Sequence, residues 1–433
     1  MRKSLFKQKD YTLLIFGKFI SMIGSNMQQF ALSLYVFAIT NSATIFASML
    51  AISILPRLLM SPVAGVFGDW FDRKKMIVRL DLLNALVLAG FALYFYINQS
   101  LDLWLIYALV ITLELTEIFF ESSSAGIIPS IIDEKDMLEA KSFQSLVISI
   151  ARLLSPMIAA IVFGFSGLLL VLIVNAISFF ISSISEMFIN VPAMHKKPEK
   201  INLKAFFVDV KEGFSIIRGS KFISTIIALG TIINFVIAPF FTVGFIVLIK
   251  QVLQASDFQF GLYQTIIASS MILAPILMTK YIKRFDMARV CVVSLFIMGV
   301  SIMCIAVVPS DMVMGYFQSN TAPYIILMAL SFIVGVSVGF INIIIGTLFA
   351  KIVPIHAMGR TSTVMNLLVT IFIPIGHITF GFLYDVIAPT HVIIMSGSIV
   401  MITILIYRKT LLSFSKKEDK QKINKEGVLA HAH

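Results

Sequence analysis

Long apolar segments recur along the whole chain and constrain its fold more than any other feature. Each extends over 20 residues or more, which is enough for a helix to cross a hydrocarbon core of about 30 Å. Of the 433 residues, 58% are hydrophobic and only 13% are charged, and a soluble domain carries far more charge. The sequence therefore predicts an all-α membrane protein that crosses the bilayer many times.

The apolar segments number twelve, which places both termini on one side of the membrane. The predicted spans are 11–36, 43–67, 77–97, 103–123, 144–165, 168–189, 222–249, 259–280, 289–308, 324–350, 362–384 and 389–408. The first apolar segment runs well beyond the core of a signal peptide, so we expect it to remain as a span.

The basic residues between the spans predict an orientation. Five basic stretches fall on the side of the termini: "MRKSLFKQK", "DRKKMIVR", "HKKPEKINLK", "KYIKRFDMAR" and "SKKEDKQKINK". By the positive-inside rule, both termini are expected in the cytoplasm and the protein in the plasma membrane, which is the inner membrane of a two-membrane cell. The net charge of +11 then reflects topology, and nucleic acid is not expected as a partner.

Two similar halves are expected. Residues 1–190 form the first six-helix half and residues 222–408 the second. The linker 191–221 is expected to carry an amphipathic helix on the inner leaflet, and residues 409–433 form a basic cytoplasmic tail. Because "SPMIAAIVFGFSG" aligns with "IPIGHITFGFLYD" at an offset of about half the chain, the halves look like a duplicated unit, as in many transporters.

Three glutamates interrupt the fourth apolar segment. In "ELTEIFFE", Glu114, Glu117 and Glu121 have helical offsets that fall within an arc of about 60°, so they share one face. A charge at mid-bilayer costs about 2.5–3.5 kcal/mol on insertion scales, so such residues usually face a protein interior or a water-filled cavity. We expect a cavity here, with Glu114 near the midplane and Glu121 near the cytoplasmic boundary.

Two roles are open for these carboxylates. They could be structural ion pairs that hold helices together. Alternatively, they couple transport to protons, because neighbouring carboxylates in a low-dielectric cavity repel each other and at least one is expected to hold a proton near neutral pH. In that case Glu114, the deepest, is the best candidate for competition between proton and substrate. Glu117 and Glu121 would pass protons or cations toward the cytoplasm.

Polar residues in other spans suggest further walls of the cavity. Asn26, Gln29 and Ser33 repeat the offsets of the glutamates in the first span, and Asn234 and Asn342 stand in the seventh and tenth. We expect the first two, with Asn234 and Asn342, to bind protons or substrate. A single Asn in a membrane helix can instead bond a neighbouring helix.

Arginines near the cytoplasmic ends of spans have two interpretations each. Arg57 is expected to snorkel to the interface, as is Lys18, but Arg57 could instead pair with Glu117 or Glu121. Arg152 could pair with Asp81, at the start of the third span. Glu186 also lies in the cytoplasmic half of its span.

The loop after the second span carries a motif of a known family. "GVFGDWFDRKK" resembles the signature loop of the major facilitator superfamily, although Trp70 stands where a base is usual and Asp72 where Gly is usual. The chain is most similar to the branch that holds macrolide efflux proteins and enterobactin-type siderophore exporters. Stretches such as "LPRLLMSPVAGV" and "NAISFFISS" carry the resemblance along the chain.

The resemblance implies a twelve-helix fold with spans 1, 4, 7 and 10 around a central cavity. It also implies a gate, in which Gly65 lets helices approach closely and Asp69 latches the cytoplasmic side. The remaining gate candidates are basic, namely Arg73, Lys74, Arg57 and Arg152. The basic run could alternatively serve topology alone. Span five keeps only "SP" of the Gly-rich antiporter motif, so that motif does not support antiport.

These features predict a secondary transporter that exports an amphipathic small molecule in exchange for protons. A cationic compound is one form that this substrate could take. One alternative is an exporter of an anionic siderophore or a lipid-like metabolite, and another is a sensor derived from a transporter. An enzyme is not expected, since no catalytic group or metal-ligand cluster stands out, and no ATP-binding Gly-rich loop is present. We expect no cofactor, a monomer, and membrane lipids as the surroundings.

Overall fold

A computed structural model describes the backbone of residues 8–191, 211–212, 214–281, 286–317, 319–353 and 358–430, and within these ranges it describes no side chains for 61–70, 279–281, 311–312, 359–360 and 414–430. The chain divides into two compact units. Unit 1 is Met1–Ile201 with Ser256–Thr265, and unit 2 is Asn202–Ala255 with Ile266–His433. The division falls inside the predicted linker. Most of the amphipathic helix expected there lies outside the described residues.

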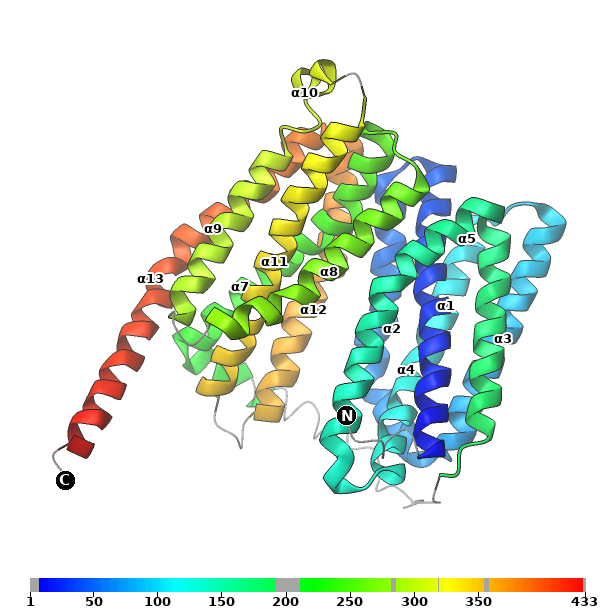
Figure 1. Cartoon of the computed structure of the whole chain (residues 1–433), viewed down its shortest axis with the longest axis horizontal. Coiled ribbons are helices and arrows are strands. Elements are labelled where there is room, and N and C mark those ends of the chain that lie inside the picture. The colour runs from blue at the N-terminus through cyan, green and yellow to red at the C-terminus, as the bar shows by residue number, and fades with distance from the viewer. Residues whose placement is uncertain are drawn as a thin grey trace. The chain divides into compact units, whose positions relative to one another are not determined.

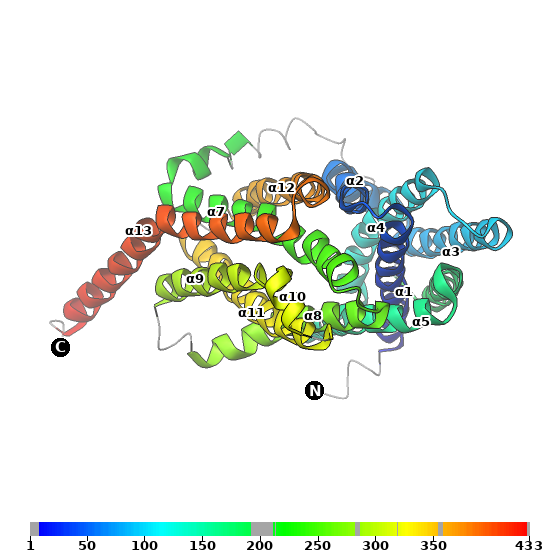
Figure 2. The ribbon, with the colours of Figure 1, turned by 90° about the horizontal axis from the view of Figure 1, so that it is seen from above.

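Unit 1 is a bundle of long helices (Figure 1). They are α1 (Lys9–Thr40), α2 (Ala43–Trp70), α3 (Arg73–Asn98), α4 (Leu103–Ile131), the short η2 (Glu134–Asp136) and α5 (Met137–Met187). Seen from above, α1 stands between α5 on one side and α2 and α4 on the other (Figure 2).

The long helix α5 contains a sharp break. Ser166 and Gly167 leave helical geometry, and Gly167 has a φ of 63°, which glycine adopts without the steric penalty of a Cβ atom. The chain turns back there, so α5 comprises an ascending and a returning segment. This confirms the sequence prediction that one span ends at 165 and the next begins at 168.

Unit 2 is also helical in its described part. Its elements are α7 (Lys221–Pro239), the π-helical turns η3 (Phe240–Gly244) and η4 (Val247–Val252), α8 (Asp257–Tyr281, whose start belongs to unit 1), α9 (Met287–Ile305), α10 (Asp311–Tyr316), α11 (Thr321–Ile352), α12 (Met358–Val386) and α13 (Pro389–Ala430). Gly335 and Gly339 of α11 let it pack closely against Ser270 and Ala274 of α8.

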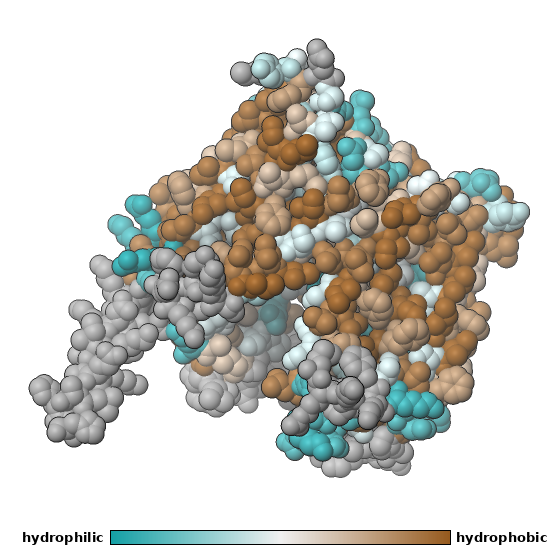
Figure 3. All heavy atoms as spheres, in the orientation of Figure 1, coloured by the Kyte–Doolittle hydropathy of each residue, from teal (hydrophilic) through white to brown (hydrophobic). Residues whose placement is uncertain are grey.

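Ten helical stretches of the described residues are long and apolar enough to cross a membrane. One of them contains the break in α5, whereas α1, with 32 residues, is not among them because its polar face lowers its hydropathy. Large apolar side chains cover the outer surfaces (Figure 3), for example Leu86, Leu93 and Leu405, each at least 60% exposed. An all-α membrane architecture is confirmed, whereas the exact number of twelve spans stays a prediction.

One end of unit 1, here called the base, is where α1 and α3 begin and α4 and α5 end (Figure 1). An apolar cluster fills it, with Tyr11, Leu14, Ile77, Phe120 and Ile189 among its members. Hydrogen bonds tie the helix ends together around the cluster. The Tyr11 hydroxyl donates to the Ala140 carbonyl at 2.7 Å, and the Asn190 amide donates to Asp10 Oδ1 at 2.9 Å.

The returning segment of α5 packs closely along α1. A Cβ atom at Gly24 would lie 2.2 Å from both Asn175 Oδ1 and Ser178 Oγ. Asn175 in turn donates to the side chain of Gln28, so it joins the two helices. This close approach fixes which face of α1 can point away from α5, toward α2 and α4.

Filling this contact should destabilise unit 1. We expect Gly24→Leu to lower the free energy of unfolding by about 1–3 kcal/mol, the usual effect of overpacking a tight contact. Thermal unfolding of the purified protein in detergent measures it. Gly90→Ala in α3 is the control, since a Cβ atom there meets nothing within 4 Å. Equal melting temperatures for Gly24→Leu and wild type would contradict the contact.

Candidate functional site: a charged pocket in unit 1

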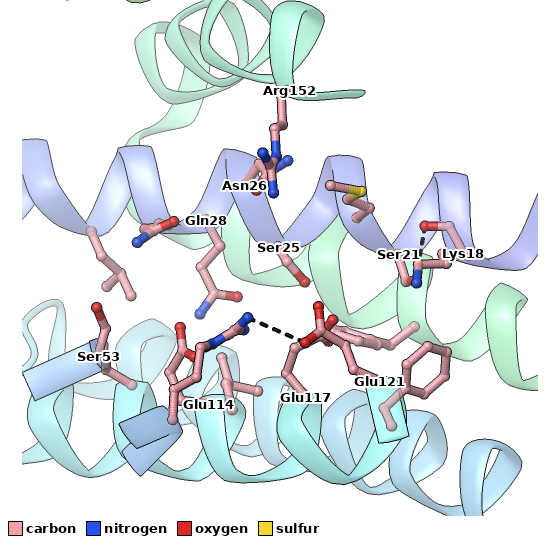
Figure 4. A pocket seen from close by; sticks show the side chains of 18 of the residues that line it. Lys18, Ser21, Ser25, Asn26, Gln28, Ser53, Glu114, Glu117, Glu121 and Arg152 are labelled. Carbon is pink, nitrogen blue, oxygen red and sulfur yellow. Dashed lines mark hydrogen bonds and ion pairs between the residues drawn. The ribbon is translucent and has the colours of Figure 1, made fainter. Parts of the chain in front are cut away.

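A cavity of about 240 Å³ opens in unit 1 between α1, α2, α4 and α5 (Figure 4). Its walls carry three carboxylates, three cationic side chains and several polar groups. The titratable lining residues are Lys18, Arg57, Glu114, Glu117, Glu121 and Arg152. The pocket is therefore strongly charged but close to neutral in total.

The acidic stripe of α4 forms one wall. Glu114, Glu117 and Glu121 all line the pocket, which confirms that they share one helical face and that this face meets a cavity. The intervening residue Thr116 points to the other side of α4, where its hydroxyl donates to Asn84 Oδ1 of α3 at 2.7 Å. The helix thus separates a charged face from a face that packs on α3.

Arg57 of α2 connects two members of the stripe. Its Nη1 atom lies 3.2 Å from Glu121 Oε2 and its Nη2 atom lies 3.6 Å from Glu114 Oε2. The expectation that Arg57 snorkels to the interface is wrong, because two carboxylates within reach offer a stronger interaction than solvent at the helix end. Pairing with Glu121 was the alternative, and the second pair, with Glu114, was not predicted.

Glu117 stands between the two paired glutamates and has a different environment. Within the described part of the chain it makes neither a hydrogen bond nor an ion pair. Lys18 of α1, on the opposite wall, interacts electrostatically with Glu117 but forms no ion pair among the described residues (Figure 4). Glu117 is thus the carboxylate of the pocket that no described cation neutralises by contact.

The wall opposite α4 is the polar face of α1. Asn26 and Gln29 line the pocket as expected, and the Nδ2 atom of Asn26 is buried without a hydrogen-bond partner among described residues. Ser33 does not line it, and its hydroxyl donates to the Gln29 carbonyl at 2.6 Å. Sequence reasoning missed Lys18, Ser21 and Ser25, which continue the same face at helical spacing.

Arg152 reaches the pocket from the ascending part of α5 and points toward Asn26 (Figure 4). The alternative pairing of Arg152 with Asp81 is wrong. Asp81 is buried, 1% exposed, beside Ser182 of the returning segment of α5, whereas the Arg152 side chain is exposed. Across residues 8–60 and 71–191, Arg152 has no ion-pair partner.

Part of the predicted gate is described. Arg73 donates from Nη1 to the Gly126 carbonyl of α4 at 3.0 Å, and its guanidinium occupies the space where a side chain at position 126 would stand. Asp72, which replaces the usual glycine, caps α3 by accepting from the Lys75 amide at 3.1 Å. Lys74 is partly exposed in the first turn of α3.

Four predicted residues stay outside this description of the pocket. Gly65 and Asp69 fall in the segment 61–70, of which only the backbone is described. Asn234 and Asn342 belong to unit 2. There Asn234 donates to the Val369 carbonyl at 3.4 Å, a contact that fits the packing alternative, and the Asn342 side chain is exposed.

Comparisons with known proteins agree with this architecture. The profile of the Major Facilitator Superfamily matches residues 14–377. Macrolide efflux protein A of Streptococcus pyogenes is 22% identical over 92% of this chain and 94% of its own length. The protein of the same name from Enterococcus faecalis is 22% identical over 76% of this chain and 98% of its own length.

The fold matches solved transporter structures. The crystal structure of a bacterial homologue of the iron transporter ferroportin in an inward-facing state superimposes with a TM-score of 0.70 at 16% identity, over 95% of this chain and 100% of that one. A likeness at this identity shows the fold alone. Together with the family profile and the membrane helices, it leads to one conclusion: the chain belongs to the Major Facilitator Superfamily and is a multi-pass membrane transporter.

Proposed function

We propose that the protein exports an amphipathic small molecule across the plasma membrane in exchange for protons, acting as a monomer. The observation that carries the proposal is Glu117, a carboxylate in the wall of a transporter pocket without a hydrogen bond or ion pair among the described residues. The names of the relatives, macrolide efflux protein A, support export of an amphipathic compound.

The ion pairs of Arg57 shift the best candidate for coupling from Glu114 to Glu117. Arg57 pairs with both Glu114 and Glu121 by direct contact, so a cation of the protein already offsets part of their charge. Glu117 lacks such a contact, and either a proton or a cationic group of the substrate can neutralise it. Competition between the two is the chemical basis of antiport, because binding one expels the other.

An acidic substrate is the second candidate, and Arg152 favours it. This guanidinium lines the pocket without an ion pair among the described residues, and guanidinium groups bind carboxylates and phosphates in a bidentate manner. A substrate with an acidic group would bind there, as expected for a siderophore or a lipid-like metabolite. Glu117 would then serve proton coupling alone.

The direction of transport rests on orientation, which we propose from charge. Basic residues gather at the base of unit 1, among them Lys9, Arg73, Lys75 and Lys135, and the positive-inside rule assigns such an end to the cytoplasm. The gate of the family motif would then act at the cytoplasmic side.

The coupling role is tested by neutralising Glu117. Glu117→Gln keeps the size of the side chain but cannot bind or release a proton, so we expect loss of pH-gradient-driven uptake of a macrolide into inverted vesicles. Exchange of the same compound down its own gradient should persist. Glu121→Gln is the matched control, because Glu121 is already paired with Arg57 and its loss should leave gradient-driven uptake within about threefold of wild type.

Wild-type coupling in Glu117→Gln would remove Glu117 from the mechanism. If the glutamate merely braced helices, Glu117→Leu would lower the melting temperature, whereas Glu117→Gln would change neither stability nor transport. The two variants together therefore separate a structural role from a coupling role.

Substrate class is tested at Arg152. If the substrate is acidic, Arg152→Gln should weaken its binding about tenfold or more, the effect of losing a charge-assisted bidentate contact. Binding of a cationic macrolide should stay the same or tighten. Thermal-shift titration with an acidic siderophore and a cationic macrolide measures both, because a ligand of the native state raises the melting temperature. Tighter siderophore binding by the variant would exclude the second candidate.

Orientation is tested by labelling single cysteines in a protein from which Cys291 and Cys304 have been removed. Lys75 and Lys135, at the base of unit 1, are exposed, as is Gln99 at the opposite end of α3. We expect a membrane-impermeant reagent added to intact cells to label Gln99→Cys but neither Lys75→Cys nor Lys135→Cys. The opposite pattern would reverse the proposed orientation and, with it, the direction of the gate.

A further inference from the structure

Two carboxyl groups of unit 1 are buried outside the pocket. Asp81 of α3 is 1% exposed and Glu186, near the end of α5, is 0% exposed. Both carboxylate oxygens of Glu186 and the Oδ2 atom of Asp81 lack a hydrogen-bond partner among the described residues. No described cation forms an ion pair with either residue. They contrast with Asn84, the neighbouring buried polar group on α3, which Thr116 satisfies.

The two carboxyl groups lie within electrostatic range of each other and of two charged residues of the pocket wall. Asp81 and Glu186 interact electrostatically with each other, with Lys18 of α1 and with Glu117 of α4. The hydroxyl of Ser182, fully buried, lies beside the Asp81 carboxyl group but makes no hydrogen bond of ordinary geometry with any described residue. Four helices thus contribute charge or polarity to one small region.

The charges of this region do not balance. Asp81, Glu186 and Glu117 are three acidic groups, and Lys18 is the one cation that acts on both buried carboxyl groups. An ionised carboxylate without a partner in a low-dielectric interior costs several kcal/mol, and adjacent carboxylates disfavour each other's ionised form. A bound proton removes this penalty. A metal ion does not fit, because the described residues contain no group of three His, Cys, Asp or Glu side chains arranged to hold one.

An apolar layer separates the carboxyl groups from the base. About one helical turn nearer to the base than each of the four charged residues, the same chain segment places a buried apolar side chain. These are Leu14 below Lys18, Ile77 below Asp81, Phe120 below Glu117 and Ile189 below Glu186, all at most 3% exposed. They belong to the apolar cluster of the base. Lys18 and Glu117 line the pocket (Figure 4), and of the four apolar side chains Phe120 lines it too. The side of the region that is open to water is therefore the pocket.

We infer that Asp81 and Glu186 form a buried proton-binding site that exchanges protons with the pocket past Glu117 and Lys18. A proton that leaves Glu117 reaches a carboxylate oxygen of the pair, and a proton that leaves the pair returns by the same route. When the pair is ionised, the Lys18 ammonium compensates it; when the pair is protonated, Lys18 is free to compensate Glu117. The site would deepen the proposed coupling, and only its role in transport rests on the proposed function.

Infrared spectroscopy of the purified protein in lipid vesicles at neutral pH tests the site directly. A protonated carboxyl group has a carbonyl stretching band distinct from that of a carboxylate, and the band shifts in heavy water. We expect wild type to show such a band, and Asp81→Asn and Glu186→Gln each to lose part or all of it. Asp102→Asn, which removes an exposed carboxylate at the start of α4, is the control and should leave the band intact.

The route is tested by the rate at which the band shifts after transfer to heavy water. Glu117→Gln should slow the shift several-fold, because the group that passes protons is then fixed in its neutral state. An unchanged rate would exclude passage through Glu117. No protonated-carboxyl band in wild type, or a band that survives in both Asp81→Asn and Glu186→Gln, would overturn the site itself.

These outcomes are independent of transport. If one variant fails to fold, the other still reports on the pair. A wild-type band that disappears only in alkaline buffer supports a buried proton. Absence of the band at neutral pH overturns the proposed site. Loss of the transport proposal with the band intact would leave the buried site standing. Proton-coupled transport without the infrared band would exclude the buried site but would leave Glu117 in the coupling scheme.

Discussion

Charge in a low-dielectric interior is the constraint on which unit 1 depends. A carboxylate there must find a cation, hydrogen-bond donors, water or a proton. Unit 1 contains two groups of carboxyl side chains with different environments. Glu114 and Glu121 share the guanidinium of Arg57 at 3.6 and 3.2 Å, while Asp81 and Glu186 have no comparable partner in the described part of unit 1. Glu117 interacts electrostatically with members of both arrangements and with Lys18.

Close helix packing makes this arrangement possible. Gly17 and Gly24 let the returning segment of α5 approach α1 so closely that added Cβ atoms would lie 3.0 and 2.2 Å from serine hydroxyls. The contact holds one face of α1 against α5 and turns Lys18, Ser25 and Asn26 toward the pocket. At the base, Arg73 crosses from α3 to the Gly126 carbonyl of α4, so a residue of the family motif also ties one wall of the pocket to the helix behind it.

Much of the fold follows from hydropathy read along the chain. The break in α5 at Ser166 and Gly167 was predictable because a short polar loop separates two apolar segments there. The acidic face of α4 was also predictable, because the helical spacing of the three glutamates can be read within one segment of the sequence. The first helix shows the limit of hydropathy. Its polar face lowers the average below that of a typical span, and the same polar face supplies a wall of the pocket.

The sequence by itself determined the membrane-spanning helices, the shared face of the three glutamates and the family, because each depends on residues near one another in the chain or on a continuous motif. Only the tertiary structure decided which charges meet. Arg57 was expected at the interface and instead pairs with Glu114 and Glu121, and Asp81 lies near Glu186 instead of Arg152. Electrostatic pairing acts over a few ångströms between different helices, and helical spacing along the chain does not specify the rotation or approach of one helix relative to another.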